Sequence, residues 1–342
     1  MGKAECISYD DNQLPYIDLG SARIRMDKEQ APEWALKKAQ DELREVDGIK
    51  EQAIKQLREL IQNEKQLNLP LDDEYMMMFL RPCHYYPESA LKRVRASAFQ
   101  FHFHFQFTFA FVLFLQLKNF YNMKLKYGQA CENIVPDKLR NVFEADILNL
   151  LPTRDQHGRR LLVLEAGKKW KPSKVPLVDL FRGIQLTVLG SMVEPYSQIC
   201  GAVVIIDMEG NCFASPAGLP LSHITQFTPS FAAMLLDYIQ DCICMRLKGV
   251  HIVNNSYIFN MLFAIFKPFI REKLRKRIFF HGKDWKSLTS HIDAGALPPK
   301  YGGTATWELP PGKLLGEFFE CYLKDYEQAD SYGYPAGYKM KK

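Results

Sequence analysis

The chain has 342 residues, of which 47% are hydrophobic and 24% are charged, and its formal net charge at pH 7 is +5. That apolar content supports a large buried core, which excludes a disordered chain, and the length suits one large α/β domain beside a smaller helical one. The first fifteen residues lack the apolar run of a secretory signal, and Cys6 stands where a myristoylation signal needs Ser or Thr. We therefore expect a cytoplasmic protein without a lipid anchor.

Motifs for metal or cofactor chemistry are missing from the sequence. The eight cysteines form no C-x-x-C pair and have no histidines at zinc-ligand spacing, so we expect reduced thiols, no metal and no cofactor. Glycine-rich nucleotide motifs and a G-x-S-x-G element are also missing, which argues against an enzyme. Asp207 and Glu209 form a possible acid–base pair, but we favour a structural strand end, and we interpret His251 as a core histidine.

The N-terminal third is predicted to be helical. We expect residues 1–30 to be a tail and residues 31–135 to form a small all-α domain. Residues 31–63 are rich in Ala, Leu and charged residues and have no proline beyond the first turn, which favours helices. Residues 72–81 predict a further helix, with Asp72 as its N-cap.

Residues 94–116 depart from this helical pattern. Phenylalanine occupies every second position from 99 to 111, which is a β-like alternation, and no charged residue lies between Arg95 and Lys118. One interpretation is a transmembrane helix, because the stretch is long enough. Its His and Gln side chains would then lie in hydrocarbon without evident partners, which is costly.

Another interpretation is that residues 94–116 are foreign to the fold. Without them, ESALKR would continue into LKNFYNMKLKYG as one helix, and FAFVLFLQ resembles a translated polypyrimidine tract that ends at a splice acceptor. We favour a retained intron or an error in the assigned gene structure over a functional insertion. Residues 211–218 are predicted to be a second, shorter insertion that lies in a loop.

Strand and helix patterns alternate in the second half of the chain. Residues 159–167, 201–210 and 249–255 are apolar, partly β-branched runs, and helical patterns separate them. This alternation predicts an α/β domain with a parallel sheet, to which we assign residues 136–305. Residues 306–342 are expected to be a C-terminal tail.

An apolar segment next to a basic one is the strongest pointer to function. Residues 256–266 are almost purely apolar and form either buried core or a movable gate. Residues 267–277 hold six cations against one acid, and Ile270, Leu274 and Ile278 predict the inward face of a basic helix. Such a junction suits reversible docking on an anionic membrane and passage of an apolar molecule, although a solvated surface helix is the alternative. Because the sequence has no motif that recognises the grooves of DNA or RNA, we expect no nucleic-acid partner.

Several segments together resemble a known family. FLRPCHYYPESALKR, LPTRDQHGRRLLVLEAGKKWKP, GAVVIIDMEG, HITQFTPSFA, HIVNNSYIFNMLFAIFKPF and LPPKYGG occur in the order found in the CRAL-TRIO lipid-binding family, in its branch of tocopherol-transfer, retinaldehyde-binding and clavesin proteins. The resemblance runs from about residue 30 to 305. It implies a CRAL-TRIO domain, in which a sheet floors an apolar lipid cavity under a helical lid, preceded by a small all-α domain.

The resemblance also implies two sets of site residues. A phosphatidylinositol bisphosphate headgroup would be held by Arg246, Lys248, Lys273 and Arg277. The lipid pocket would be lined by Phe181, Ile184, Val188, Val204, Ile206, Phe227, Leu235, Ile239, Phe259, Leu262 and Phe263. Ile184 and Val188 stand where the tocopherol-transfer relative has serines, which puts tocopherol itself in doubt as the ligand.

We therefore expect a monomeric, non-enzymatic carrier that transfers a hydrophobic small molecule between membranes. It would bind phosphoinositides at a basic surface, peripherally and reversibly. The alternative is a phosphoinositide-binding trafficking adaptor. The sequence does not name the ligand, because an apolar pocket selects by shape.

Overall fold

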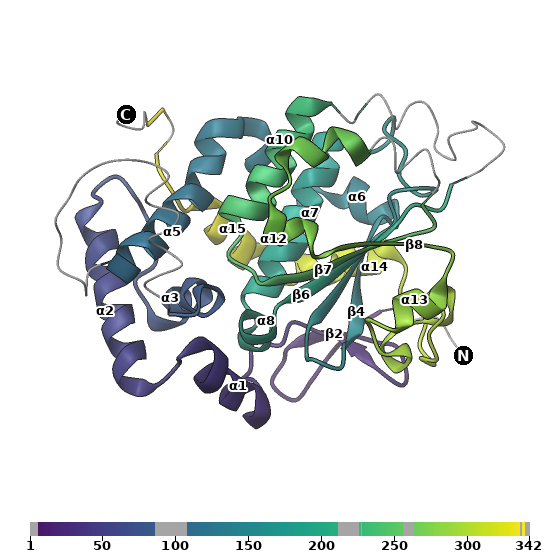
Figure 1. Ribbon diagram of the computed structural model, residues 1–342, viewed down its shortest axis with the longest axis horizontal. Coiled ribbons are helices and arrows are strands. Elements are labelled where there is room, and N and C mark those ends of the chain that lie inside the picture. The colour runs from purple at the N-terminus through teal and green to yellow at the C-terminus, as the bar shows by residue number, and fades with distance from the viewer. Residues whose placement is uncertain are drawn as a thin grey trace.

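The computed structural model describes residues 6–85, 108–210, 226, 228–255, 263–335 and 337–338 (Figure 1). It confirms the predicted α/β fold class with a helical N-terminal part, although the domain boundaries stay predictions. The described cysteines are free thiols, and the described residues contain no group of His, Cys, Asp and Glu arranged to hold a metal ion.

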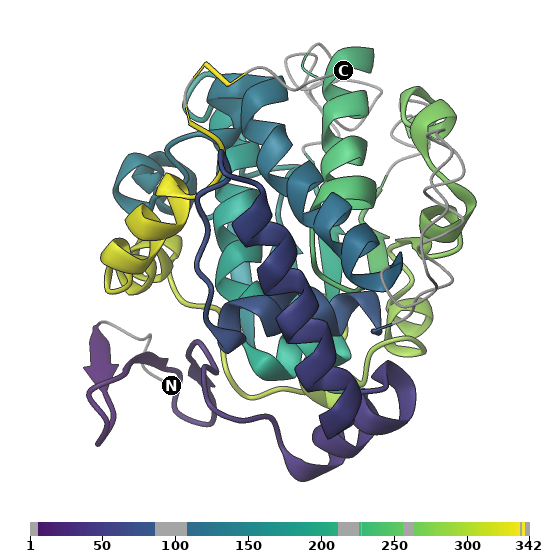
Figure 2. The same ribbon diagram turned by 90° about the vertical axis from the view of Figure 1, so that its left-hand side faces the viewer.

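The helical part contains α1 (Glu33–Leu43), α2 (Asp47–Asn63), α3 (Asp73–Leu80) and α5 (Thr108–Tyr127), with a short 3₁₀ helix, η1 (Arg81–Cys83), after α3. Asp72 caps α3 as predicted, because its carboxylate accepts a hydrogen bond from the Tyr75 backbone N–H at 2.8 Å. α2 lies against α5 (Figure 2), and Lys118 of α5 pairs with Glu64 at the end of α2 at 2.6 Å. The predicted helices in residues 31–81 are therefore confirmed.

The end of the phenylalanine-rich stretch is helical. Residues 94–107 lie outside the described part of the chain, but residues 108–116 form the first turns of α5. The predicted β-alternation is therefore wrong from residue 108 onward. Phe114 is buried in the main core beside Leu117. Among the described residues, no helix combines the length and apolarity needed to span a bilayer.

The main sheet has five strands in the order β4-β5-β6-β7-β8. The strands are β4 (Leu148–Arg154), β5 (Arg160–Leu164), β6 (Ala202–Asp207), β7 (Leu247–Val253) and β8 (Ile278–Gly282). β5 to β8 are parallel, as predicted, and β4 is antiparallel to β5. The edge strand β8 was not predicted, because Ile278 continues the helical spacing of Ile270 and Leu274 in the sequence.

Helices cover both faces of this sheet (Figure 1). One face carries α7 (Leu177–Met192) and α10 (Pro229–Asp237), and α10 continues into a π-helical turn, η5 (Tyr238–Cys242). The other face packs against α13 (Trp285–Thr289) and the segment after it, through Leu288, Ile292 and Trp307. The remaining short elements are η3 (Gly128–Cys131), η4 (Pro136–Lys138), α6 (Arg140–Glu144), α8 (Pro195–Cys200), η6 (Phe263–Ile265), η7 (Lys267–Phe269), α12 (Glu272–Arg275), η8 (Ala294–Ala296) and η9 (Pro299–Tyr301).

Both segments that were expected to be tails contain ordered elements. β1 (Ile7–Tyr9), β2 (Pro15–Asp18) and β3 (Arg23–Ile24) form a small antiparallel sheet within residues 1–30. α14 (Gly312–Glu320) and α15 (Leu323–Ser331) fill most of the C-terminal segment. Their buried side chains, which include Leu315, Phe318, Phe319 and Tyr326, belong to the main core. The expectation of tails is therefore corrected, since apolar residues spaced three to four apart give each helix a buried face.

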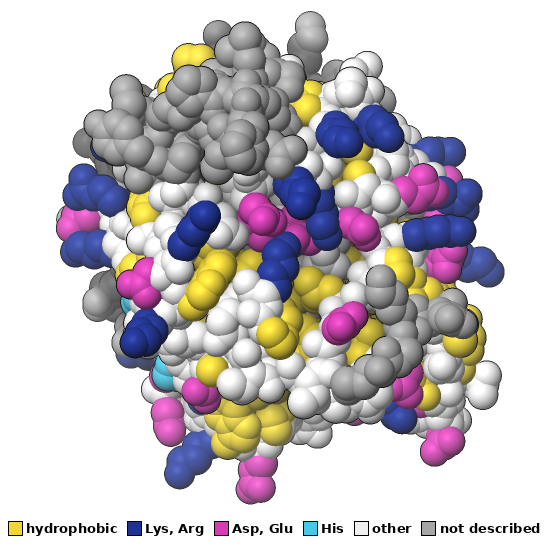
Figure 3. All heavy atoms as spheres, turned by 90° about the vertical axis from the view of Figure 1, so that its right-hand side faces the viewer, with side chains coloured by type: hydrophobic (Ala, Val, Ile, Leu, Met, Phe, Trp, Pro, Cys, Tyr) yellow, Lys and Arg dark blue, Asp and Glu magenta, His cyan; other side chains and the backbone are white. Residues whose placement is uncertain are grey.

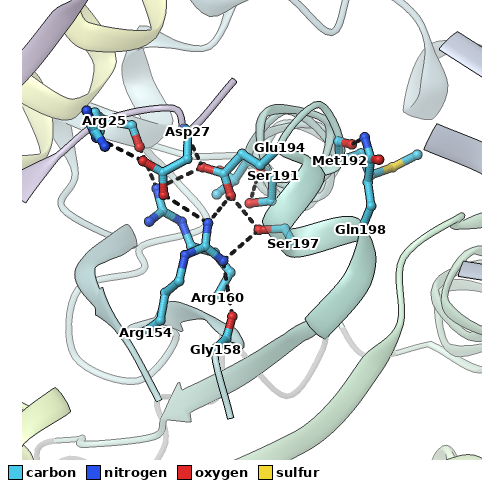
Figure 4. A network of polar contacts seen from close by, with 11 residues as sticks. Arg25, Asp27, Arg154, Gly158, Arg160, Ser191, Met192, Glu194, Ser197 and Gln198 are labelled. Atoms are coloured by element: carbon cyan, nitrogen blue, oxygen red, sulfur yellow. Dashed lines mark hydrogen bonds and ion pairs between the residues drawn. The ribbon is translucent and has the colours of Figure 1, made fainter. Parts of the chain in front are cut away.

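A buried network of charges anchors the N-terminal segment to the α/β unit (Figure 4). Glu194 accepts contacts from Arg154 at 2.9 Å and Arg160 at 3.1 Å, and Arg154 also reaches Asp27 at 3.0 Å. Ser197 also donates a hydrogen bond to the Glu194 carboxylate. Because Asp27 follows β3 and Glu194 precedes α8, the network holds together segments far apart in the sequence.

Candidate functional site

An apolar surface runs across the parallel strands on the side that α7 partly covers. The strand register aligns Leu164, Ile206, Ile252 and Phe280 in one row across β5, β6, β7 and β8. A second row, aligned in the same way, consists of Leu162, Val204, Val250 and Ile278. Of these eight residues only Val204 and Ile206 were predicted from the sequence. Residues two apart on a strand share a face, so the alternation in each strand was the available signal for the others.

This surface is incompletely covered. Val203 and Ile205 face the opposite side of β6, where they are 1% and 0% exposed, whereas Val204 and Ile206 are only half-buried. At the edge of the sheet Phe280 is 41% exposed. The side of the sheet that was predicted to floor a cavity is therefore the more open of the two.

The predicted lid contributes one described residue to this surface. Phe263, in η6, packs against the cluster that contains Ile206 and Ile252. Its ring meets the Phe280 ring edge-on, with 5.2 Å between the ring centroids. Phe227, Phe259 and Leu262 lie outside the described residues.

The other predicted pocket residues are divided between two apolar clusters. Ile184 and Val188 of α7 join the main core, which Val204 also contacts. Phe181 is fully buried in a separate cluster, with its ring 5.4 Å from that of Tyr238. Leu235 and Ile239 pack against that same cluster. The structure therefore joins Ile206 with Phe263, but it does not bring all the predicted residues around one space.

A cavity of about 760 Å³ lies elsewhere, between the helical part and the α/β unit. Its lining includes Tyr121 of α5, Gln185 and Leu189 of α7, Tyr238 of η5 and Tyr326 of α15. None of the predicted pocket residues that the structure describes lines it. Tyr238 is shared with the cluster around Phe181, so the two regions are adjacent.

The four predicted headgroup residues lie around the N-terminal ends of β7 and β8. Arg246 and Lys248 are at the start of β7, Lys273 is on α12, and Arg277 precedes β8. The Arg277 side chain donates a hydrogen bond to the backbone carbonyl of Leu247. Arg246 is buried, Lys248 and Arg277 are half-buried, and Lys273 is exposed.

Burial and neighbouring cations lower the pKa of several groups in this region. Burial, followed by the charges of Arg246 and Arg277, lowers the pKa of Lys248 to about 8. Burial and then Arg159 lower the pKa of Arg277. Burial, with contributions from Arg246, Lys248 and Lys273, also lowers the pKa of His84 to about 4. We refer to Arg159, Arg246, Lys248, Lys273 and Arg277 as the basic cluster. Arg159 and His84 were not predicted to lie here, because contacts between residues so distant in sequence leave no local signal.

The basic segment is not one continuous helix. It consists of η7, an extended residue at Ile270 and the single turn of α12, followed by β8. Leu274 is buried as predicted, but Ile278 begins a strand, so the expectation of one long basic helix is wrong. Residues from Ile278 onward pair in parallel with β7, and they therefore belong to the sheet although their sequence has a helical pattern.

Charged residues also gather at the carboxyl ends of the strands, where acidic and basic side chains lie side by side (Figure 3). Lys300 contacts both Glu165 and Asp207, at 3.0 Å from the latter. Asp207 also accepts hydrogen bonds from Asn254 at 2.8 Å and from the Tyr301 hydroxyl at 3.1 Å. A carboxylate that accepts this many contacts holds the end of β6 in place. This is the structural role that we favoured for Asp207 from the sequence.

His251 lies in a stack of aromatic side chains. Its Nδ1 is 2.9 Å from His281 Nε2, and its ring stacks on Phe279 with 5.0 Å between centroids. Burial, followed by the charges of His281 and His291, lowers the pKa of His251 to about 3. His251 is therefore a neutral residue of the packed interior at physiological pH.

Comparison with known proteins finds relatives over most of the chain. The CRAL/TRIO domain family matches residues 144–303. Clavesin-1 of Pongo abelii is 31% identical over 299 residues, which cover 87% of this chain and 75% of that protein. Alpha-tocopherol transfer protein-like of Mus musculus is 29% identical over 269 residues, which cover 78% of this chain and 69% of that protein. The crystal structure of Sfh5 aligns with a TM-score of 0.44 and 12% identity, over 83% of this chain and 99% of that chain.

Proposed function

The chain belongs to the CRAL-TRIO family, whose members bind and transfer lipids, and we propose that it carries a hydrophobic small molecule of isoprenoid type, such as a tocopherol-like or retinoid-like compound, between membranes. In this proposal the molecule lies on the apolar rows of the sheet, and the segment that contains Phe263 covers it. The protein acts without catalysis and works as a monomer in the cytoplasm that visits membranes reversibly.

The observation that carries this proposal is the partly open apolar surface of the sheet. Eight aliphatic and aromatic side chains lie in two rows, and Phe263 packs on their edge from outside the sheet. Leu162 and Ile252 are buried, but the other six side chains stay partly exposed, and exposed apolar surface is unfavourable in water unless a ligand or partner covers it. A ligand between Ile206 and Phe263 would cover it.

We further propose that the basic cluster binds the headgroup of phosphatidylinositol bisphosphate. Burial and then the charges of neighbouring cations lower the pKa of Lys248 and of Arg277, and a bound phosphate would stabilise their charged forms. Arg offers paired N–H donors and Lys a compact charge, and both suit phosphate monoesters. The cluster supports the proposal because Arg246, Lys248, Lys273 and Arg277 come together from separate elements.

Identification of the bound molecule tests the proposal that the protein is a carrier. The purified protein is extracted with organic solvent, and the extract is examined by mass spectrometry. We expect one hydrophobic species in stoichiometric amount, and we expect the protein to move this species between donor and acceptor vesicles. The alternative is a phosphoinositide-binding trafficking adaptor. An adaptor would bind phosphoinositide vesicles but yield no ligand and no transfer, and that result would reject the carrier.

A further inference from the structure

Glu42 brings a negative charge to the basic cluster from a different part of the molecule. It lies near the C-terminal end of α1, and its Oε2 is 3.5 Å from Arg246 Nη2. The Arg246 side chain is only 4% exposed, whereas that of Glu42 is 51% exposed. Glu42 therefore approaches a buried guanidinium from the solvent side.

Arg246 is incompletely satisfied by its own surroundings. One of its terminal nitrogens donates to the backbone carbonyl of Ile199, but its buried Nε has no hydrogen-bond partner among the described residues. Burial lowers the pKa of Arg246, and Glu42 is the largest influence that raises it. A buried guanidinium with an unmatched donor favours a stronger acceptor than the one present.

The contact between Glu42 and Arg246 is one that a ligand can replace. Its 3.5 Å separation is long for a charge-assisted hydrogen bond, and an ion pair with one half-exposed partner contributes little net stability. A phosphate monoester carries a charge of about −1.5 to −2 and three acceptor oxygens, compared with one charge and two oxygens for a carboxylate. Phosphate therefore interacts more strongly with the same cations.

We propose that Glu42 is an internal counter-ion, which occupies Arg246 in the free protein and is displaced by a phosphomonoester of the bound headgroup. This inference rests on the proposed phosphoinositide site and adds a residue that sets its affinity. Groups of low charge do not displace Glu42, so Glu42 favours highly charged headgroups over singly charged ones.

The displacement also links the two parts of the chain. Glu42 belongs to the helical part, whereas Arg246 leads into the sheet, and the Glu42 backbone carbonyl lies 3.3 Å from His84 Nδ1. When the headgroup binds, α1 loses its ion pair to the α/β unit. Linkage requires that whatever strengthens this ion pair weakens headgroup binding by the same factor.

The test compares Glu42→Gln with Asp41→Asn in the full chain. Asp41 is the exposed neighbour on α1, so both variants remove one negative charge from the same helix. Binding is measured on vesicles that contain phosphatidylinositol bisphosphate and on phosphatidylserine vesicles of equal surface charge. Soluble inositol trisphosphate is titrated separately.

We expect Glu42→Gln to bind the phosphatidylinositol bisphosphate vesicles and inositol trisphosphate about five-fold more tightly than the parent, while Asp41→Asn stays within about two-fold. If Glu42→Gln strengthens binding to vesicles but not to inositol trisphosphate, Glu42 merely repels the membrane and the inference is overturned.

Two further outcomes separate the inference from the proposed function. If the parent prefers phosphatidylinositol bisphosphate to phosphatidylserine but Glu42→Gln and Asp41→Asn bind alike, only the role of Glu42 is rejected. If neither the parent nor Glu42→Gln shows that preference, the headgroup site itself is rejected, and the role of Glu42 with it.

Discussion

The Arg160 guanidinium lies 3.1 Å from the Glu194 carboxylate, and both side chains are almost completely buried, at 2% and 1% exposure. Arg154 contacts the same carboxylate and also pairs with Asp27 (Figure 4). Burial lowers the pKa of Arg160, while Glu194 is the largest influence that raises it. The position of the N-terminal segment therefore depends on the charge of Glu194.

Glu194→Gln should destabilise the fold by about 3 kcal/mol, because the buried Arg160 guanidinium loses its ion-pair partner and Arg154 keeps only Asp27. The free energy of unfolding in urea measures the loss. Glu317→Gln is the control, because the pair of Glu317 with Lys313 is solvent-exposed and its loss should cost under about 1 kcal/mol. Equal losses in the two variants would contradict a central role for Glu194.

Replacing Lys273 and Arg277 with Ala should weaken binding to vesicles that contain phosphatidylinositol bisphosphate. Each cation near an anionic surface contributes about 1 kcal/mol, so the double variant should lose about 30-fold in affinity. Added salt should reproduce part of this loss in the parent. Arg275 and Lys276 lie between these two residues, are exposed, and serve as the matched pair for an Ala control. A parent and a Lys273/Arg277 variant that bind equally at low salt would reject these residues as the headgroup site.

Phe263→Asp should slow transfer of the ligand between vesicles by about five-fold or more, because a charged side chain would not pack on Phe280 and close the apolar surface. The melting temperature should change little, since Phe263 is half-buried. Phe269→Asp alters an exposed residue of the next turn and should leave transfer nearly unchanged. Global unfolding of the Phe263 variant would show instead that the residue is fixed core.

A variant that lacks residues 94–116 should be soluble, monomeric and able to bind lipid, whereas the full chain should aggregate without detergent. Uncharged segments of alternating phenylalanine associate edge to edge, and each exposed phenylalanine leaves about 2 kcal/mol of burial unrealised. In the shortened chain Leu91 would stand three residues before Leu117, the spacing at which Phe114 is now buried.

Size-exclusion chromatography and circular dichroism measure this outcome. A second variant that lacks only residues 94–107 keeps α5 intact and controls for damage to that helix. A soluble, monomeric full chain together with a misfolded shortened chain would establish residues 94–116 as a structural element.

Stability should fall on acidification in part because of His251. Its pKa is about 3 in the fold and about 6.5 in an unfolded chain, so between these values only the unfolded state takes up the proton. This contribution is complete above pH 6.5 and is lost by about 1.4 kcal/mol per pH unit as the pH falls toward 3. His251→Gln should therefore reduce the dependence of the melting temperature on pH between about pH 6 and about pH 4. His157→Gln changes an exposed residue and should leave this pH dependence as it is in the parent. An unchanged slope in the His251 variant would show that His251 does not contribute to the loss of stability in acid.

Local patterns were sufficient for much of the fold. The Asp72 cap, the helices in residues 31–81 and the strands β5, β6 and β7 follow from residues within a few positions of one another. Val204 and Ile206 were expected in the pocket because of the family resemblance, and the strand register places both on the same face of β6. Sequence motifs in a particular order were also enough to identify the family, since order is a property of the chain itself.

Other features arose only from contacts between distant residues. β8 is a strand because β7 offers it a pairing edge, although its sequence continues a basic helical pattern. α14 and α15 are part of the core because the rest of the molecule provides a surface on which their apolar faces are buried. For β8, tertiary pairing outweighs a local preference worth only about 1 kcal/mol.

The sequence by itself determined which residues are apolar or cationic, and it supplied the four cations of the proposed headgroup site. Only the tertiary structure decided that Arg159 and His84 join them, that Glu42 opposes Arg246, and that the predicted pocket residues divide between separate clusters. The physical reason is that charge and apolarity are properties of single side chains. Pairing, burial and pKa depend on which distant segments the chain brings within a few ångströms of one another.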